Sequence, residues 1–334
     1  MEKRYRPVVG REMLFALENT PVDYVSKVDE SLLQKFGLRK GDFNGTSDKD
    51  QVLGLEKELK DFEVECGGSA ANVASGYSNL GLPAAFAGSI GNDSNGDLYK
   101  KSLIDSNVRP YLSVRDEKNG VCHVLVTPDG ERTFLVYMGA SSDLKPEDVP
   151  KEAIAHSGFL HSTAYALDSI SAALEKGIEY AKANNVLVSF DLASRKSIER
   201  HEKKLDDILS NTDILFVNRE EADAFGFKKG DELKLIEYMT KHYGIALVAY
   251  KLREDGAIIS SGHGNKTAMV MSYKVNVINT NGAGDGFAAG LLYGLTSNYD
   301  LFNSGKIATF YASRIIMQES SKISYKLFDI EGML

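Results

Sequence analysis

From about residue 150 onward, the chain alternates between two kinds of hydrophobic pattern. Between 169 and 184, apolar residues recur at positions 170, 173, 174, 178 and 181, which is the spacing of one helix face. Further helices are expected in the charged segment 197–209 and directly after Asn218. Short apolar runs predict buried strands at 186–190, 213–217 and 245–250. Strands separated by helices predict an α/β fold with a doubly wound, mostly parallel sheet and helices on both faces.

The first 140 residues are richer in strand patterns and turns. Asp129-Gly130 separates two apolar stretches and is typical of a β-hairpin turn. We interpret parts of about 18–63 and 108–139 as a small β-rich lid on a single α/β domain that spans 1–334.

A glycine-rich segment, NTNGAGDGF at 279–287, precedes a helical pattern with apolar residues at 287, 291, 292 and 295. A turn that opens a helix presents unpaired N–H groups and the positive end of the helix dipole, which suits a phosphate or an oxyanion. Asp285 at this place would suit a base that takes a proton from an attacking hydroxyl. The alternative is a tight turn in which Asp285 caps the helix. The spacing matches neither a P-loop nor a dinucleotide fingerprint.

A second glycine segment reads GGSAANVA at 67–74. The pair Gly67-Gly68 allows close approach of a ligand, and Asn72, one turn into the following helix, can offer both a donor and an acceptor to hydroxyl groups. The alternative is a packed glycine turn with an interior asparagine.

Composition narrows the classes of function. The chain has 334 residues and a net charge of −8, with 43% hydrophobic and 26% charged residues. It lacks a basic run with interleaved aromatic residues, so nucleic acid is not an expected partner. The two cysteines, Cys66 and Cys122, are expected to be free thiols, and no zinc spacing occurs. No apolar stretch reaches a membrane span, and a cytoplasmic location is expected.

These motifs together resemble the PfkB (ribokinase-like) family of carbohydrate and nucleoside kinases. The quoted motifs occur in order at 67–72, at 88–96 as Gly-x-x-Gly-x-Asp-x-x-Gly, at Asp191, at 218–221 as Asn-x-x-Glu, and at 282–285 as GAGD. The resemblance covers about residues 14 to 318. It implies a ribokinase-like fold and transfer of the ATP γ-phosphoryl group to a primary hydroxyl of a small molecule, with Mg²⁺ as a cofactor.

The resemblance also assigns roles around the GAGD turn. Asp285 would be the catalytic base, and the N–H groups of Gly282, Ala283 and Gly284 would form the anion hole. Asn218 and Glu221 would organise the metal, with Glu221 holding Mg²⁺ through a water. The alternative for the Asn-x-x-Glu motif is a helix cap.

Nucleotide contacts are also implied. Arg132 is similar to a lid arginine that faces the phosphates, and a solvated hairpin arginine is the equal alternative. Where the family often has Thr-Leu-Gly before its next glycine, this chain has Lys251-Leu252-Arg253 before Gly256, so its nucleotide contacts are altered. Asn279 replaces the usual aspartate before GAGD, which makes a monovalent-cation site doubtful.

On the acceptor side, the resemblance places a sugar against Asn19, Asp23, Gly67, Gly68 and Asn72. Candidates for stacking on a base are aromatic: Phe134, Tyr137 and Tyr165.

The segments at 189–194, 198–201 and 213–218 look more similar to bacterial adenosine kinases than to ribokinases. Phosphorylation of adenosine to AMP is therefore the first expectation. A sugar kinase of the ribokinase, fructokinase or 2-keto-3-deoxygluconate kinase type is the alternative, and a catalytically silent sugar- or nucleotide-binding regulator is a third. The oligomeric state is open between a monomer and a homodimer formed through the lid.

Overall fold

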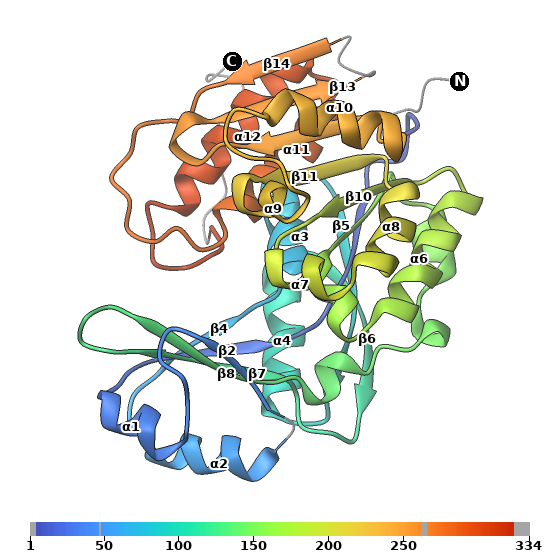
Figure 1. Ribbon diagram of the computed structural model, residues 1–334. Helices are drawn as coiled ribbons and strands as arrows, with labels where there is room; N and C mark the ends of the chain where they lie inside the picture. Colours follow the sequence, from blue (N-terminus) through green and yellow to red (C-terminus); the bar gives the residue numbers. More distant parts are fainter. Residues whose placement is uncertain (1–4, 47, 262–265, 324–334) are drawn as a thin grey trace.

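A large, mostly parallel sheet forms the centre of the protein in this computed structural model, which describes residues 5–46, 48–261 and 266–323 (Figure 1). Its strands, in spatial order, are β14 (Lys266–Val270), β13 (Ala257–Ser261), β12 (Leu247–Lys251), β11 (Ile214–Asn218), β10 (Leu187–Asp191), β9 (Phe159–Thr163), β1 (Leu14–Leu17), β5 (Ala84–Gly91) and β6 (Val108–Arg115). The strands from β12 to β6 run parallel, and β13 and β14 are antiparallel additions at one edge. The predicted α/β class is confirmed.

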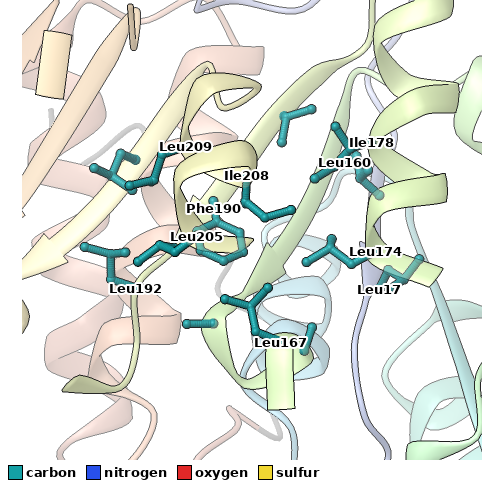
Figure 2. Close-up of a cluster of buried hydrophobic side chains, with 14 of the residues drawn as sticks. Leu17, Leu160, Leu167, Leu174, Ile178, Phe190, Leu192, Leu205, Ile208 and Leu209 are labelled. Carbon is teal, nitrogen blue, oxygen red and sulfur yellow. The ribbon is translucent and has the colours of Figure 1, made fainter. Parts of the chain in front are cut away.

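Helices cover both faces of this sheet and enclose separate cores. One core contains side chains of α6 (Ser171–Ala183), α8 (Glu202–Ser210) and α10 (Glu232–His242). The other core contains side chains of α3 (Ser69–Asn79), α4 (Ser94–Asp105), α11 (Ala283–Thr296) and α12 (Leu301–Ile315). Figure 2 shows Phe190 of β10 beside Leu205 and Ile208 of α8, within the first core. Apolar side chains at helical spacing are therefore what attach each helix to the sheet.

Short elements connect these layers. They are the helices α5 (Lys151–Ala155), α7 (Arg195–Arg200) and α9 (Arg219–Ala224), and the 3-10 turns η1 (Gly139–Ser142), η2 (Pro146–Asp148), η3 (Ala164–Asp168) and η4 (Arg253–Asp255). The charged helix expected at 197–209 is in fact divided into α7 and α8, because His201 has φ −125° and ψ 28°, outside the helical range. None of the described helices is long and apolar enough to cross a membrane.

A second, smaller sheet stands beside the large one with the strand order β3-β8-β7-β2-β4. Its members are β3 (Phe43–Gly45), β8 (Arg132–Tyr137), β7 (Val121–Val126), β2 (Val22–Lys27) and β4 (Glu63–Cys66). The helices α1 (Glu30–Lys35) and α2 (Lys49–Glu58) pack on one face and share a separate core with it, and the other face is turned toward the α/β layers (Figure 1). We refer to this sheet with α1 and α2 as the lid.

The lid differs from its predicted outline at two places, and the first is that β4 continues to Cys66, beyond the predicted end at 63. At the second place, the predicted range 108–139 begins with β6, which pairs in parallel with β5 of the large sheet and so is not part of the lid. The antiparallel hairpin of β7 and β8, predicted from the Asp129-Gly130 turn, is present.

Candidate active site

The glycine turn before α11 leaves backbone N–H groups open, as far as the described residues show. Gly282 adopts φ +76°, a left-handed conformation, and a Cβ on it would lie 2.7 Å from the carbonyl oxygen of Ser321. Within the described residues, the N–H groups of Gly282 and Gly284 have no hydrogen-bond acceptor, whereas Ala283 donates to the Thr280 carbonyl at 3.3 Å. Because α11 starts at this turn, its positive end adds to these donors. The turn can therefore bind an anion.

Asp285 lies in the first turn of α11, and two residues of α3 hold its carboxylate. The Ser69 hydroxyl donates to one oxygen at 2.6 Å, and the Asn72 amide donates to the other at 2.8 Å. Burial raises the pKa of Asp285, while these two hydrogen bonds act in the opposite direction. Asn72, predicted to bind the acceptor, thus orients the candidate base. Sequence reasoning gave no role to Ser69, although it lies inside the glycine motif.

Lys251 at the end of β12 places a cation beside this turn. Its Nζ donates to Asp191 Oδ2 at 2.7 Å and lies 3.4 Å from the place where a Cβ of Gly284 would be. Burial lowers the pKa of Lys251, but the carboxylates of Asp191 and Glu221 outweigh this effect, so the pKa is raised overall. The ammonium therefore stays charged next to the open N–H groups.

Asn218 and Glu221 form a reciprocal helix cap at the start of α9. The Asn218 Oδ1 accepts from the N–H of Glu221 at 3.0 Å, and Glu221 Oε2 accepts from the N–H of Asn218 at 2.8 Å. The cap that was considered as an alternative is therefore present. Burial raises the pKa of Glu221 to about 8.

The carboxyl group of Glu221 suits an indirect contact with Mg²⁺. In the described part of the chain no three acidic, histidine or cysteine side chains gather as a metal cluster. Mg²⁺ in nucleotide sites keeps several waters and uses few protein ligands, and a carboxylate has further lone pairs beside the two that Asn218 engages through Oε1 and Oε2. Glu221 therefore fits a role of holding the metal through water.

Three residues that were predicted to contact the nucleotide lie on other elements than the anion turn. Arg253 is exposed and pairs with Glu220, and its φ of +57° is one that glycine adopts more easily. Gly256 has φ +91°, and a Cβ on it would lie 1.9 Å from the Val270 carbonyl, so the turn into β13 requires glycine here. Arg132 is the exposed first residue of β8, on the lid.

The predicted acceptor residues Asp23, Gly67 and Gly68 come together where β2 and β4 meet α3. A Cβ on Gly67 would lie 2.7 Å from Asp23 Oδ2, and Gly68 has φ +97° at the start of α3. Burial raises the pKa of Asp23 to about 7. Glycine is therefore what allows the Asp23 carboxyl group to lie against this turn.

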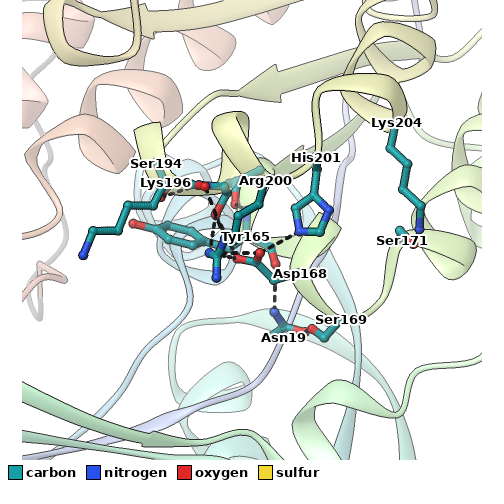
Figure 3. Close-up of polar contacts among 12 residues, drawn as sticks. Asn19, Tyr165, Asp168, Ser169, Ser171, Ser194, Lys196, Arg200, His201 and Lys204 are labelled. Carbon is teal, nitrogen blue, oxygen red and sulfur yellow. Dashed lines mark hydrogen bonds and ion pairs between the residues drawn. The ribbon is translucent and has the colours of Figure 1, made fainter. Parts of the chain in front are cut away.

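The side chain of Asn19 forms hydrogen bonds with other residues of the protein. Its Nδ2 donates to the Tyr165 carbonyl at 3.3 Å, and its Oδ1 accepts from the Ser169 hydroxyl at 2.9 Å. Figure 3 shows these residues beside Asp168, which accepts from His201 Nε2 at 2.8 Å. Asn19 thus ties the end of β1 to η3, and its contacts position the loop that carries Tyr165.

The aromatic candidates are divided between the two faces of the lid sheet and η3. Tyr165 is 42% exposed, and its hydroxyl donates to the Ala193 carbonyl at 3.4 Å. Tyr137 is buried in the core that the lid sheet shares with α1 and α2. Phe134, three residues earlier on β8, points to the opposite face of the lid sheet because side chains alternate along a strand.

A buried carboxyl group that sequence reasoning missed follows β1. Glu18 is 1% exposed, accepts from the N–H of Ala70 at 2.9 Å and also accepts from the Thr163 hydroxyl. Burial raises the pKa of Glu18 to about 7.

The segment after α12 was also missed, and it lies across the site. Ser320 and Ser321 donate to the Glu65 carboxylate of β4, and Lys322 Nζ donates to the Cys66 carbonyl at 2.8 Å. No sequence motif marked this segment.

Comparisons with known proteins identify the family of this chain. Residues 31–326 match the family described as pfkB family carbohydrate kinase. The chain is 28% identical to 5-dehydro-2-deoxygluconokinase of Listeria innocua over 277 residues, which are 79% of this chain and 85% of that protein. It is 30% identical to the enzyme of the same name from Halalkalibacterium halodurans, over 79% of this chain and 83% of that protein.

Solved structures of kinases share this fold. Adenosine kinase from Sinorhizobium meliloti superposes with a TM-score of 0.83 at 27% identity, covering 95% of this chain and 97% of that one. A probable sugar kinase from Rhizobium etli superposes with a TM-score of 0.81 at 26% identity and the same coverage. The chain belongs to the PfkB family of carbohydrate kinases and is an ATP-dependent phosphotransferase with an alcohol group as acceptor.

Proposed function

We propose that this kinase phosphorylates a primary hydroxyl of a sugar or sugar acid, with Asp285 as the catalytic base. The observation that carries the proposal is the geometry at the start of α11. A carboxylate held by Ser69 and Asn72 stands in the same helical turn as the open N–H groups of Gly282 and Gly284. Base and anion site are therefore adjacent, as phosphoryl transfer to a hydroxyl requires.

In this mechanism Asp285 accepts the proton of the acceptor hydroxyl while the N–H groups of Gly282 and Gly284 stabilise negative charge on the transferred group. Lys251 adds a fixed positive charge at the same place, and its ion pair with Asp191 keeps the ammonium in position. Ser69 and Asn72 fix the direction of the carboxylate lone pairs. Glu221 would hold Mg²⁺ through a water, and the metal supplies neutralisation of charge on the ATP phosphates.

A sugar is favoured over adenosine, which was the first expectation from the sequence. The curated relatives described above carry the name of a kinase of 5-dehydro-2-deoxygluconate, and they cover most of this chain. Of the three aromatic candidates, Tyr137 lies in the lid core and so is not available to stack on a base at the acceptor side. The acceptor side is instead polar, with Asp23 against Gly67. We therefore propose the alternative from the sequence, a sugar kinase or a kinase of the 2-keto-3-deoxygluconate type, in place of an adenosine kinase.

An ATP-consumption assay tests the proposal with adenosine, ribose, fructose, 2-keto-3-deoxygluconate and 5-dehydro-2-deoxygluconate as acceptors. We expect turnover with a sugar or a sugar acid and none with adenosine. Asp285→Asn should lower kcat by at least ~10²-fold, the scale of losing a general base, while ATP still binds. Ser210→Ala, at an exposed position on α8, serves as the matched control. Turnover of adenosine alone, or a wild-type kcat in the Asp285→Asn variant, would contradict the proposal.

A further inference from the structure

The segment that follows α12 connects the lid to the anion turn. The Ser320 hydroxyl donates to Glu65 Oε1 at 2.6 Å, and the Ser321 N–H and hydroxyl donate to the same oxygen, each at 2.9 Å. On its other side, the Asn279 amide donates to the Glu319 carbonyl at 2.6 Å. Hydrogen bonds to both neighbours fix the position of the next residue in the segment, Lys322.

The Lys322 ammonium has unused hydrogen-bonding capacity. Its Nζ donates to the Cys66 carbonyl at 2.8 Å, and among the described residues it has no other hydrogen bond and no ion pair within 4.0 Å. An ammonium carries three N–H donors, so two remain free. Burial lowers the pKa of Lys322, while the carboxyl groups of Glu65 and Asp23 act in the opposite direction. A partly buried cation with incomplete compensation is costly unless a ligand completes it.

The contact of Lys322 lies on the acceptor side of the site, because the Cys66 carbonyl that it engages directly precedes Gly67, a residue predicted to bind the acceptor. Two carboxyl groups that act on the charge of Lys322, those of Glu65 and Asp23, are directly opposed on β4 and β2. A second partly buried lysine near Asp285, Lys251, is already paired with Asp191 beside the anion turn. The two cations therefore serve different parts of the site.

We propose that Lys322 binds the carboxylate of an acidic acceptor, so that the enzyme selects sugar acids over neutral sugars. This inference rests on the proposed function and names the substrate class of the same site. A neutral hydroxyl could accept one of the remaining N–H donors but would give the ammonium no ion pair, since Glu65 and Asp23 act on it only from beyond 4.0 Å. A carboxylate would accept both donors and form that ion pair. Without Lys322, the same carboxylate would face only the acidic side chains of Asp23, Glu65 and Asp285.

Binding without ATP provides the first test. D-Gluconate and its neutral counterpart D-glucitol are titrated calorimetrically into the full chain, Lys322→Met, Lys322→Arg and the surface control Lys241→Met, whose lysine pairs only with Glu237 on α10. We expect gluconate to bind ~10–100-fold more weakly to Lys322→Met, the range of a charge-assisted hydrogen bond, and to regain affinity in Lys322→Arg. Glucitol affinity should be the same in all four proteins. Gluconate binding that ignores Lys322, or no gluconate binding to the wild type, overturns the inference.

Kinetics provide the second test and separate the two proposals. Lys322→Met should raise KM for 2-keto-3-deoxygluconate or 5-dehydro-2-deoxygluconate ~10–100-fold with KM for ATP unchanged, and should change KM for fructose less than about threefold. An equal loss for acidic and neutral acceptors, with an unchanged melting temperature, would make Lys322 a structural residue and overturn the inference. Exclusive use of neutral sugars would also overturn it while the kinase assignment stands. If no acceptor is phosphorylated but gluconate binding still depends on Lys322, the proposed function fails and the carboxylate-binding role of Lys322 stands.

Discussion

Replacement of Glu18 by glutamine should make the protein more stable above neutral pH. Glu18 is buried beside the acceptor side of the site, and its pKa rises from an ordinary 4.5 to about 7 because burial disfavours the charged form. Between these values the folded protein keeps a proton that the unfolded chain has released. Stability therefore falls as the pH rises from about 4.5 to about 7 and then stays lower. A shift of this size corresponds to about 3 kcal/mol, at 1.36 kcal/mol for each pKa unit.

Glutamine is isosteric and carries no charge, so it should remove this loss. Its oxygen can accept from the N–H of Ala70, and its amide can donate to the Thr163 hydroxyl, which is able to reverse its role as donor. Urea unfolding at pH 5 and pH 8 measures the effect. The stability of Glu18→Gln relative to wild type should increase by about 2 to 3 kcal/mol between these pH values. A difference that does not change with pH would refute the reasoning, whatever its sign. Glu179→Gln, on an exposed pair with Lys176, is the matched control.

Other expectations concern the catalytic turn and its surroundings. Lys251→Met should lower kcat ~10²-fold, because it removes the charge beside the anion site and leaves buried Asp191 unpaired; an unchanged kcat would contradict the role given to the ammonium. The apparent pKa of the acid limb in a pH profile of kcat/KM should lie above 3.8, the ordinary pKa of aspartate. The reason is that the pKa of Asp285 is raised and only the ionised carboxylate accepts a proton. Gly256→Ala should lower the unfolding free energy by more than ~2 kcal/mol in thermal or urea unfolding, since its Cβ would collide with the Val270 carbonyl; wild-type stability would show that the turn can relax.

The parts of the fold that the sequence predicted are those with a local pattern. α6 and β10 to β12 followed from apolar spacing within each segment, and the β7–β8 hairpin followed from its turn. The lid boundary was wrong because β6 has few buried side chains, and only its pairing with β5 assigns it to the large sheet. Pairing between distant strands has no signature in a short stretch of sequence.

The candidate site shows the same division. The glycine turns and Asp285 could be found because each lies within one short motif. The contact between Ser69 and Asp285 joins residues 216 positions apart, and the contact of Lys322 with Cys66 joins residues 256 positions apart. From the sequence, Asn19 was predicted to bind the acceptor. The motif does not reveal that its side-chain amide already forms hydrogen bonds with Tyr165 and Ser169.

The separate core of the lid has a consequence for how this enzyme could diversify. Leu55, Val121 and Leu135 pack only within the lid's own cluster, whereas Asp285 and Lys251 depend on α11 and β12, which belong to the cores of the large sheet. A mutation within this lid cluster therefore leaves the packing beneath the phosphoryl-transfer groups intact, while it can shift the strands that carry Asp23 and Glu65. Selectivity for new substrates can then evolve in small steps while the chemistry is inherited unchanged.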